Sequence, residues 1–224
     1  MHEIAKTDRN RILRQALSIA LAVMPFGLAF GIAAREAGLN IFEAMGFSSL
    51  VFTGSAQFAA VSVLADGGSA VTAVVAGSLL NLRSLAFGVA LAPFLAGRLR
   101  FRAAAAQLMI DEAAAVGMAQ QPDQRRYGYL AGGLSVFVLW NLSTAAGVLF
   151  LGAVGDVVLQ AGIDATIPAA FLALLWPRLS DPRQRLIALG GAAIALLGVP
   201  VLPPGLPIVA AGLAVVLGWR RRPR

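Results

Sequence analysis

The chain has no cysteine, a single histidine and few charged residues among its 224 positions. The lack of cysteine excludes disulfides, thiolate metal sites and cysteine nucleophiles. His2 lies in a polar terminal segment, where a solvated side chain is a more natural interpretation than a catalytic one. The metalloprotease HExxH, hydrolase GxSxG and phosphate-binding Walker patterns are all missing. We therefore expect no enzymatic activity, no cofactor and no bound metal.

Charge is too scarce in this sequence to cover a water-facing surface. Charged residues make up 13% and hydrophobic residues 58% of the chain, and the mean hydropathy is +0.79. A soluble domain is typically about one quarter charged. The segments 15–34, 44–65, 127–155 and 186–219 carry no charge, and roughly 20 apolar residues suffice to cross a bilayer as a helix. The sequence predicts an all-α, polytopic transmembrane helical bundle.

Positive charge gathers at the ends of the apolar segments. The basic clusters lie at 6–14, 98–102, 125–126, 178–185 and 220–224, which is typical of cytoplasmic anchors and accounts for the net charge of +7 without nucleic acid. We expect 1–14 to be a cytoplasmic segment before an uncleaved first span, 15–219 to form a single transmembrane domain, and 220–224 to be a basic cytoplasmic tail. Both termini would then face the cytoplasm of a bacterial inner membrane.

The basic clusters agree with simple hydropathy only in the second half of the chain. If all of them face the cytoplasm, each interval between clusters crosses the membrane an even number of times. Crossings at 127–151, 165–176, 186–199 and 206–219 satisfy this condition. In the first half, 16–34, 44–65 and 68–96 would make three crossings. Either 68–96 is re-entrant or broken near Asn81 and Arg83, or 103–119 also crosses; we favour a discontinuous element and six to eight crossings in total.

Ionisable residues inside apolar sequence are costly, so they usually mark a pathway or form internal pairs. Arg83 lies far from either end of its apolar segment and is a candidate clamp for a substrate carboxylate. The plainer alternative is an internal ion pair with Asp111 or Glu112. These two carboxylates are candidates for proton coupling if they lie within the membrane, and are simply solvated if they lie at its surface.

Three polar or flexible residues, Gly54, Ser55 and Gln57, interrupt the second apolar segment. Such a break frees backbone groups to meet the ammonium or carboxylate of an amino acid, although interhelical hydrogen bonding and close packing explain the same residues. Asn141 either lines a cavity or bonds across helices. A faint similarity between 81–89 and 141–148 suggests repeats at 15–119 and 127–219, or arises by chance in a chain rich in alanine and glycine.

The first apolar segment contains a proline and a GxxxG pattern. Pro25 removes one backbone hydrogen bond from a helix and is expected to kink it. Gly27 and Gly31 share a helix face and permit close approach of a second helix. We expect these residues to serve packing, with a kink that shapes a substrate cavity as the alternative.

Six motifs in register resemble the AzlC family of membrane proteins. They lie at 25–27, 52–58, 81–83, 111–113, 139–141 and 169–175, and the resemblance extends over about 14–219. It implies the large subunit of a two-component exporter of branched-chain amino acids, driven by the proton motive force and partnered by a small AzlD-type membrane subunit. By this resemblance Gln57, Asn81 and Arg83 are functional.

The sequence thus predicts a secondary transporter subunit that exports leucine, isoleucine or valine across the cytoplasmic membrane. The expected substrate-binding residues are polar or flexible positions within apolar sequence, namely Gly54, Ser55, Gln57, Asn81, Arg83 and Asn141. Besides the small subunit and the lipid bilayer, a higher oligomer is a possible assembly, and nucleic acid is not an expected partner. The alternative function is a non-transporting scaffold or regulatory subunit of a partner membrane protein.

Overall fold

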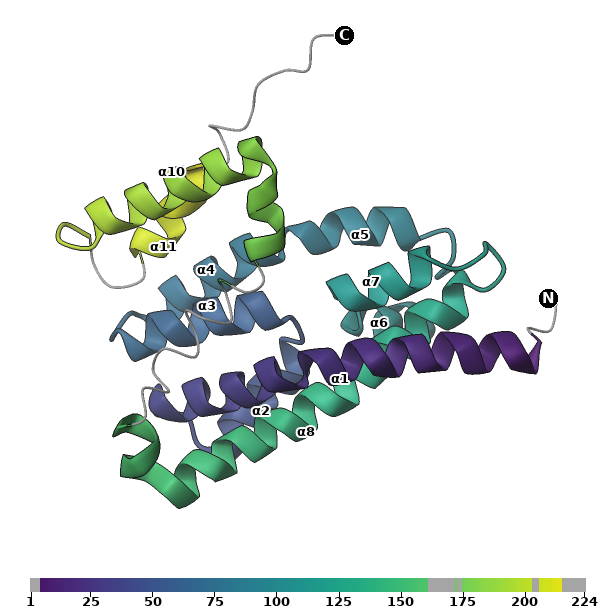
Figure 1. Cartoon of the computed structure of the whole chain (residues 1–224), viewed down its shortest axis with the longest axis horizontal. Helices are drawn as coiled ribbons and strands as arrows, with labels where there is room; N and C mark the ends of the chain where they lie inside the picture. Colours follow the sequence, from purple (N-terminus) through teal and green to yellow (C-terminus); the bar gives the residue numbers. More distant parts are fainter. Residues whose placement is uncertain (1–4, 161–171, 173–174, 203–205, 215–224) are drawn as a thin grey trace, which may run out of the picture.

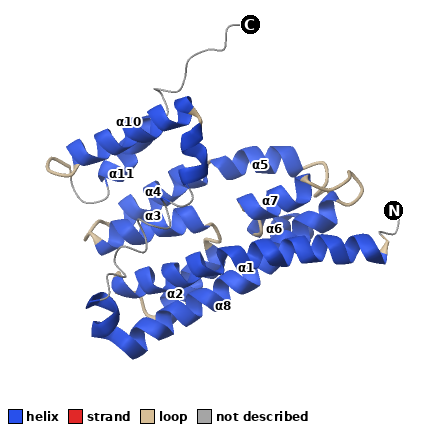
Figure 2. Ribbon diagram, in the orientation of Figure 1, coloured by secondary structure: helices blue, strands red, loops and turns tan. Residues whose placement is uncertain are grey.

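The computed structural model describes residues 5–160, 172, 175–202 and 206–214 (Figure 1). All regular elements in these ranges are helices, which confirms the predicted fold class (Figure 2). In chain order they are α1 (Lys6–Glu36), α2 (Ile41–Leu50), α3 (Gly54–Ala65), α4 (Ala70–Asn81), α5 (Arg83–Leu91), α6 (Leu99–Gln107), α7 (Asp111–Met118), α8 (Arg125–Gln160), the 3₁₀ helix η2 (Trp176–Ser180), α10 (Pro182–Gly198) and α11 (Leu206–Ala211).

The two long helices α1 and α8 run parallel and form the most extensive contact of the described chain (Figure 1). Near their starts, the guanidinium of Arg9 lies 5.3 Å from the ring centroid of Tyr127. Five residues before α1 ends, Gly31 faces Gly147, and a Cβ built on Gly31 would lie 3.0 Å from the Gly147 Cα. The sequence separation of these two pairs is nearly the same, so the two helices run side by side in the same direction over most of the length of α1.

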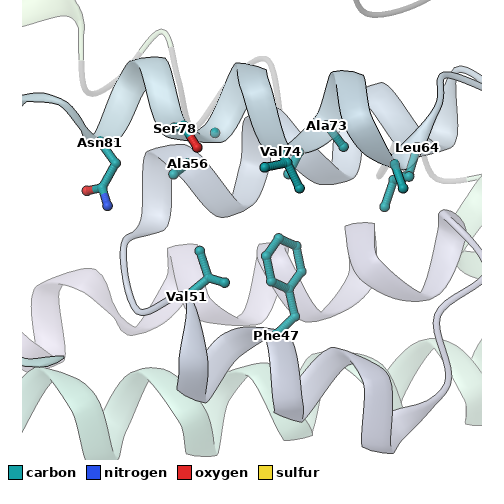
Figure 3. A pocket seen from close by; sticks show the side chains of 11 residues that line it. Phe47, Val51, Ala56, Leu64, Ala73, Val74, Ser78 and Asn81 are labelled. Atoms are coloured by element: carbon teal, nitrogen blue, oxygen red, sulfur yellow. The ribbon is translucent and has the colours of Figure 1, made fainter.

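The second apolar segment forms two short helices instead of one span. Asn40 caps α2 by accepting from the N–H groups of Phe42 and Glu43, and Glu43 accepts from the Asn40 N–H at 2.8 Å. After Val51 the chain reverses, and α3 runs back in the opposite direction to α2, with a cavity between the two helices (Figure 3). A ten-residue helix is about 15 Å long, half the thickness of the hydrocarbon core. The α2–α3 hairpin therefore has the dimensions of a re-entrant element.

The third apolar segment is broken where the sequence predicts it. Helices α4 and α5 meet at Leu82 and are bent by 42°. Together they return the chain toward the end of the molecule at which α1 and α8 begin (Figure 1). The return is marked by contacts of α8 with the segment after α5, because Arg125 lies over the ring of Phe94 at 4.7 Å and Arg126 donates to the Ala96 carbonyl at 3.5 Å.

This path offers a way to bring the basic clusters of the first half to one side of a membrane. Three basic clusters, 6–14, 98–102 and 125–126, come together at one end of the molecule. Helix α1 leads away from that end and the bent α4–α5 pair leads back to it, while α2 and α3 are each too short for a full span. Segment 103–119, the alternative extra crossing, is divided between the short helices α6 and α7.

Two described helices are long and apolar enough to cross a membrane, and α4–α5 makes a third when the bent pair is counted as one span. These helices and the scarcity of charge are those of a multi-pass membrane protein. The expected crossing at 186–199 corresponds to α10, whereas most of 165–176 and part of 206–219 lie outside the described residues. The total of six to eight crossings therefore stays a prediction.

Candidate functional site

Three helices begin around one cavity. Helices α3, α5 and α7 start at Gly54, Arg83 and Asp111, and all three of these residues line a cavity of about 340 Å³. We call it the Arg83 cavity. Its lining residues come from α1, α3, α4, α5, α7, α8 and nearby turns: Val23, Phe26, Phe52, Thr53, Gly54, Ser55, Phe58, Leu80, Arg83, Ile110, Asp111, Glu112, Val136, Trp140 and Leu175.

The polar side of the Arg83 cavity is a small network across three helices. The Nε of Arg83 lies 3.1 Å from Oδ1 of Asp111, and its Nη2 donates to the Ser55 hydroxyl at 2.7 Å. The side chains of Arg83 and Asp111 remain 39% and 36% exposed. The ion pair thus holds the start of α5 against the start of α7, and its charged groups stay accessible to a ligand.

The helix starts add their own electrostatics to this network. The first N–H groups of a helix lack intrahelical acceptors and carry partial positive charge, which favours anions. No side-chain hydrogen bond caps α3 at Thr53, and its first turn contains no acidic residue. In α7, by contrast, Asp111 and Glu112 occupy the first turn. The beginning of α3 is therefore the more open site for a carboxylate, and the beginning of α7 presents negative charge.

The opposite side of the Arg83 cavity is apolar and aromatic. The Trp140 ring stacks on Phe30 with centroids 6.3 Å apart and meets Phe58 edge-on at 6.5 Å. A Cβ on Gly54 would lie 2.9 Å from Cη2 of Trp140, so the glycine lets the indole close against α3. Phe26 from α1 completes the aromatic part of this wall. The cavity therefore offers charges on one side and a fixed apolar surface on the other.

Asn81 lies in a different cavity, although only one residue separates it from Arg83. This Asn81 cavity has a volume of about 360 Å³ and lies between α2 and the α3–α4 pair (Figure 3). Asn81 accepts a hydrogen bond from Ser84 at 2.7 Å, and Ser78 is the other polar side chain of the lining. The remaining wall is apolar, formed by Phe47, Val51, Ala56, Ala60, Leu64, Ala70, Ala73, Val74 and Gly77.

Gln57 and Asn141 are buried and line neither of these two cavities. Gln57 Nε2 donates to the Ser48 carbonyl at 3.1 Å, and its Oε1 has no hydrogen-bond partner among the described residues. Asn141 accepts from the Ser49 hydroxyl at 2.9 Å and donates to the Phe137 carbonyl at 2.9 Å. Both amides thus bind the end of α2, and a substrate-binding role for them stays a prediction.

The residues of the first apolar segment lie at the contact of α1 with α8. Helix α1 continues through Pro25 without interruption. A Cβ on Gly27 would meet the Ser143 hydroxyl, and one on Gly31 would meet the Thr144 carbonyl. The two glycines therefore lie where α1 and α8 approach closely, next to the part of α1 that lines the Arg83 cavity.

The candidate residues chosen from the sequence include the charged residues that line the Arg83 cavity, but not the aromatic residues of its apolar wall. Phe26 and Phe58 belong to motifs that were recognised, and Trp140 adjoins Asn141, but hydropathy alone does not separate cavity-lining aromatics from core aromatics. The repeat proposed from 81–89 and 141–148 remains untested; Asn81 ends a short helix whereas Asn141 lies inside α8. In the described part of the chain, no cluster of acidic or histidine side chains could hold a metal ion.

Comparisons with known proteins identify the family of the chain. The family model described as AzlC protein matches residues 18–154. A protein of Archaeoglobus fulgidus described as an uncharacterized membrane protein is 32% identical over 199 residues, which cover 88% of this chain and 87% of that protein. No solved structure matches the chain. The matched region includes every element of the Arg83 cavity except the position of Leu175.

Proposed function

Since the chain belongs to the AzlC family, we propose that it is the large subunit of a secondary transporter that exports small apolar amino acids such as leucine, isoleucine and valine. The observation that carries this proposal is the Arg83 cavity, which combines a positive group, two carboxylates and an apolar wall. An amino acid of this class is a zwitterion with an apolar side chain, and these three features complement its three parts.

The carboxylate of the substrate binds between the start of α3 and Arg83. There it accepts hydrogen bonds from the first N–H groups of α3 and from the guanidinium, which matches a carboxylate bidentately. The ammonium binds Asp111 and Glu112 at the start of α7. The side chain of the substrate packs against Phe58 and Trp140. The volume of about 340 Å³ is near the lower end of the roughly 300–1,000 Å³ of small-molecule sites.

Binding of the zwitterion exchanges partners within the polar network. In the empty site Arg83 and Asp111 neutralise each other, and a zwitterion supplies each of them with a new opposite charge. A proton that enters from outside and binds the Asp111 or Glu112 carboxylate removes the charge that holds the ammonium. Release of the amino acid would then be linked to proton entry, which is the coupling expected of an exporter driven by the proton motive force.

The proposal includes a partner and an orientation. The end of the molecule with the three basic clusters faces the cytoplasm of a bacterial inner membrane, in accordance with the positive-inside rule. A small AzlD-type membrane subunit completes the transporter. The Arg83 and Asp111 side chains are each more than one-third exposed, and exposed charge within a membrane is costly, which supports a second subunit that shields it from lipid.

Reconstituted flux tests the proposal. The chain with its small subunit, in liposomes under a pH gradient, should transport radiolabelled leucine, and Arg83→Ala should reduce this flux by at least about a hundredfold, because it removes a charged hydrogen-bonding group from the site. Arg102→Ala, which changes an exposed arginine of α6 outside the cavity, is the matched control and should transport normally. No leucine flux in the wild type would refute the proposal.

The same pair of variants examines the alternative role as a scaffold. In a non-transporting subunit, Arg83 serves only the ion pair with Asp111. Arg83→Ala would then disturb co-purification of the small subunit and leave any flux through the partner unchanged. Loss of flux with intact co-purification decides for a transporter.

A further inference from the structure

The end of α2 presents a problem that a continuous helix does not have. The last carbonyl groups of a helix lack intrahelical donors, and within a membrane each must find a partner in the protein. Helix α2 ends at Leu50 and the chain reverses after Val51. The carbonyl groups of Ser48, Ser49 and Leu50 therefore need donors from other elements.

Two glutamine side chains supply these donors. Gln57 Nε2, from the second turn of α3, donates to Ser48 at 3.1 Å. Gln107 Nε2 donates to Ser49 at 2.7 Å and to Leu50 at 3.2 Å. The Gln57 bond closes the α2–α3 hairpin locally. The Gln107 bonds span sequence separations of 58 positions (to Ser49) and 57 positions (to Leu50). They therefore connect the α2–α3 hairpin to a distant part of the chain.

Gln107 occupies a special position in the chain because it is the last residue of α6. Three residues connect it to Asp111, and this connection is a tight turn in which Met109 N–H donates to Ala106 and Ile110 N–H donates to Leu108. Because this turn is short and hydrogen-bonded, the position of Gln107 determines the position of Asp111. Whatever fixes Gln107 therefore fixes the start of α7 and its carboxylates.

The other end of the Gln107 bonds leads to the opposite wall of the cavity. Leu50 is followed by three residues and then by Gly54 and Ser55, which begin α3 and line the Arg83 cavity. Gln107 thus lies at the junction of two helix breaks, one leading to Ser55 and the other to Asp111. Ser55 and Asp111 both contact Arg83.

We propose that Gln107 is a positioning residue of the transport site: its amide sets the distance between the start of α3 and the start of α7, and with it the distance between the carboxylate and ammonium subsites. The inference rests on the proposed function, because it assigns these subsites to an amino acid. Gln107 does not line the cavity, so it acts through Asp111.

A donor-deleting and a donor-retaining variant test this role. Gln107→Leu removes both hydrogen bonds, whereas Gln107→Arg keeps N–H donors on a side chain long enough to reach the same carbonyls. We expect Gln107→Leu to raise the KM for leucine flux between about tenfold and a hundredfold, as a misplaced binding group does, and to change the maximal rate much less. Gln107→Arg should restore most of the affinity. Gln121→Leu, in the exposed turn before α8, is the matched control.

A double-mutant cycle separates positioning from a general effect on the fold. If Gln107 acts by placing Asp111, then Gln107→Leu should cost little further affinity in the Asp111→Asn background, because coupled residues are not additive. Additive losses, an unchanged KM in Gln107→Leu, or failure of Gln107→Arg to restore affinity would each overturn the inference. Wild-type flux is measured in the same experiment, so its absence would refute the proposed function, whereas normal flux with an unaffected Gln107→Leu variant would refute only the role of Gln107.

Discussion

The α1–α8 pair and the region of short helices from α2 to α7 satisfy their backbone hydrogen-bonding groups within apolar sequence in opposite ways. Long helices satisfy their own backbone groups, so α1 and α8 need only pack, and they do so through Gly27, Gly31 and Gly147. The short helices end repeatedly within apolar sequence. Their free backbone groups are met by side chains such as those of Gln57 and Gln107.

This difference separates stability from function within one small chain. The parallel pair presents a rigid apolar face that supplies Phe26 and Trp140 to the cavity wall. The broken region supplies each charged group of the Arg83 cavity, together with the uncapped start of α3. Substitutions in the first region should therefore act on folding, and substitutions in the second on transport.

The largest expected effect is on the α1–α8 contact. A Cβ at Gly31 would meet the Thr144 carbonyl and approach Gly147, and backbone atoms cannot move aside as a flexible side chain can. Gly31→Ala should lower the free energy of unfolding by about 3 kcal/mol, the upper end of the usual cost of overpacking. Reversible denaturant titration in mixed micelles measures this change.

Gly46 provides a matched control in the broken region. A Cβ on this α2 glycine meets nothing within 4 Å. Gly46→Ala should leave stability unchanged or raise it by up to about 1 kcal/mol, because alanine has the higher helix propensity. Equal destabilisation by Gly31→Ala and Gly46→Ala would show that the parallel pair is not the scaffold of the molecule.

The next largest effect concerns binding instead of folding. Asp111→Asn keeps the size of the side chain but removes the charge that faces Arg83 at 3.1 Å and, by our proposal, the substrate ammonium. We expect leucine affinity to fall at least about tenfold, equivalent to 1.4 kcal/mol, with a melting temperature close to that of the wild type because both partners are partly exposed. Binding of radiolabelled leucine to the purified protein measures the first quantity and thermal unfolding the second.

Asp123→Asn, in the exposed turn between α7 and α8, is the control for Asp111→Asn. It alters the net charge of the chain by the same amount and should leave leucine affinity unchanged. A loss of stability without a loss of affinity in Asp111→Asn would mean that the ion pair belongs to the fold and not to the site.

The sequence predicted the membrane class, α1, α8 and the break beside Arg83, because uncharged segments and a stranded charge follow directly from the cost of transfer into lipid. It predicted an interruption of the second apolar segment at Gly54, Ser55 and Gln57, but not the reversal of the chain after Val51. Residues 44–65 are uniformly uncharged, and hydropathy does not encode direction. It also could not pair Gln107 with the end of α2, because that contact joins distant residues through backbone carbonyls, which carry no sequence signal.

A smaller effect is expected where the two regions meet. The Tyr129 hydroxyl, on α8, donates to the Ala105 carbonyl on α6 at 2.6 Å, and the side chain is fully buried. Tyr129→Phe should lower the free energy of unfolding by about 1 kcal/mol. The cost stays moderate because the Ala105 carbonyl also accepts from the Leu108 N–H. Tyr127→Phe, which keeps the ring beneath Arg9, is the control and should be neutral in the same denaturant titration.

The smallest effect tests whether α2 is held by side chains at many points or mainly by the two glutamines. Ser49→Ala removes the 2.9 Å bond to Asn141, which retains its own bond to the Phe137 carbonyl. Interhelical hydrogen bonds in membranes contribute about 0.6 kcal/mol on average, and we expect a loss of this size. Ser62→Ala on α3 is the control. A loss of several kcal/mol would assign the anchoring of α2 to its contact with α8, and the broken region would then depend on the parallel pair for its shape as well as for the apolar wall of the cavity.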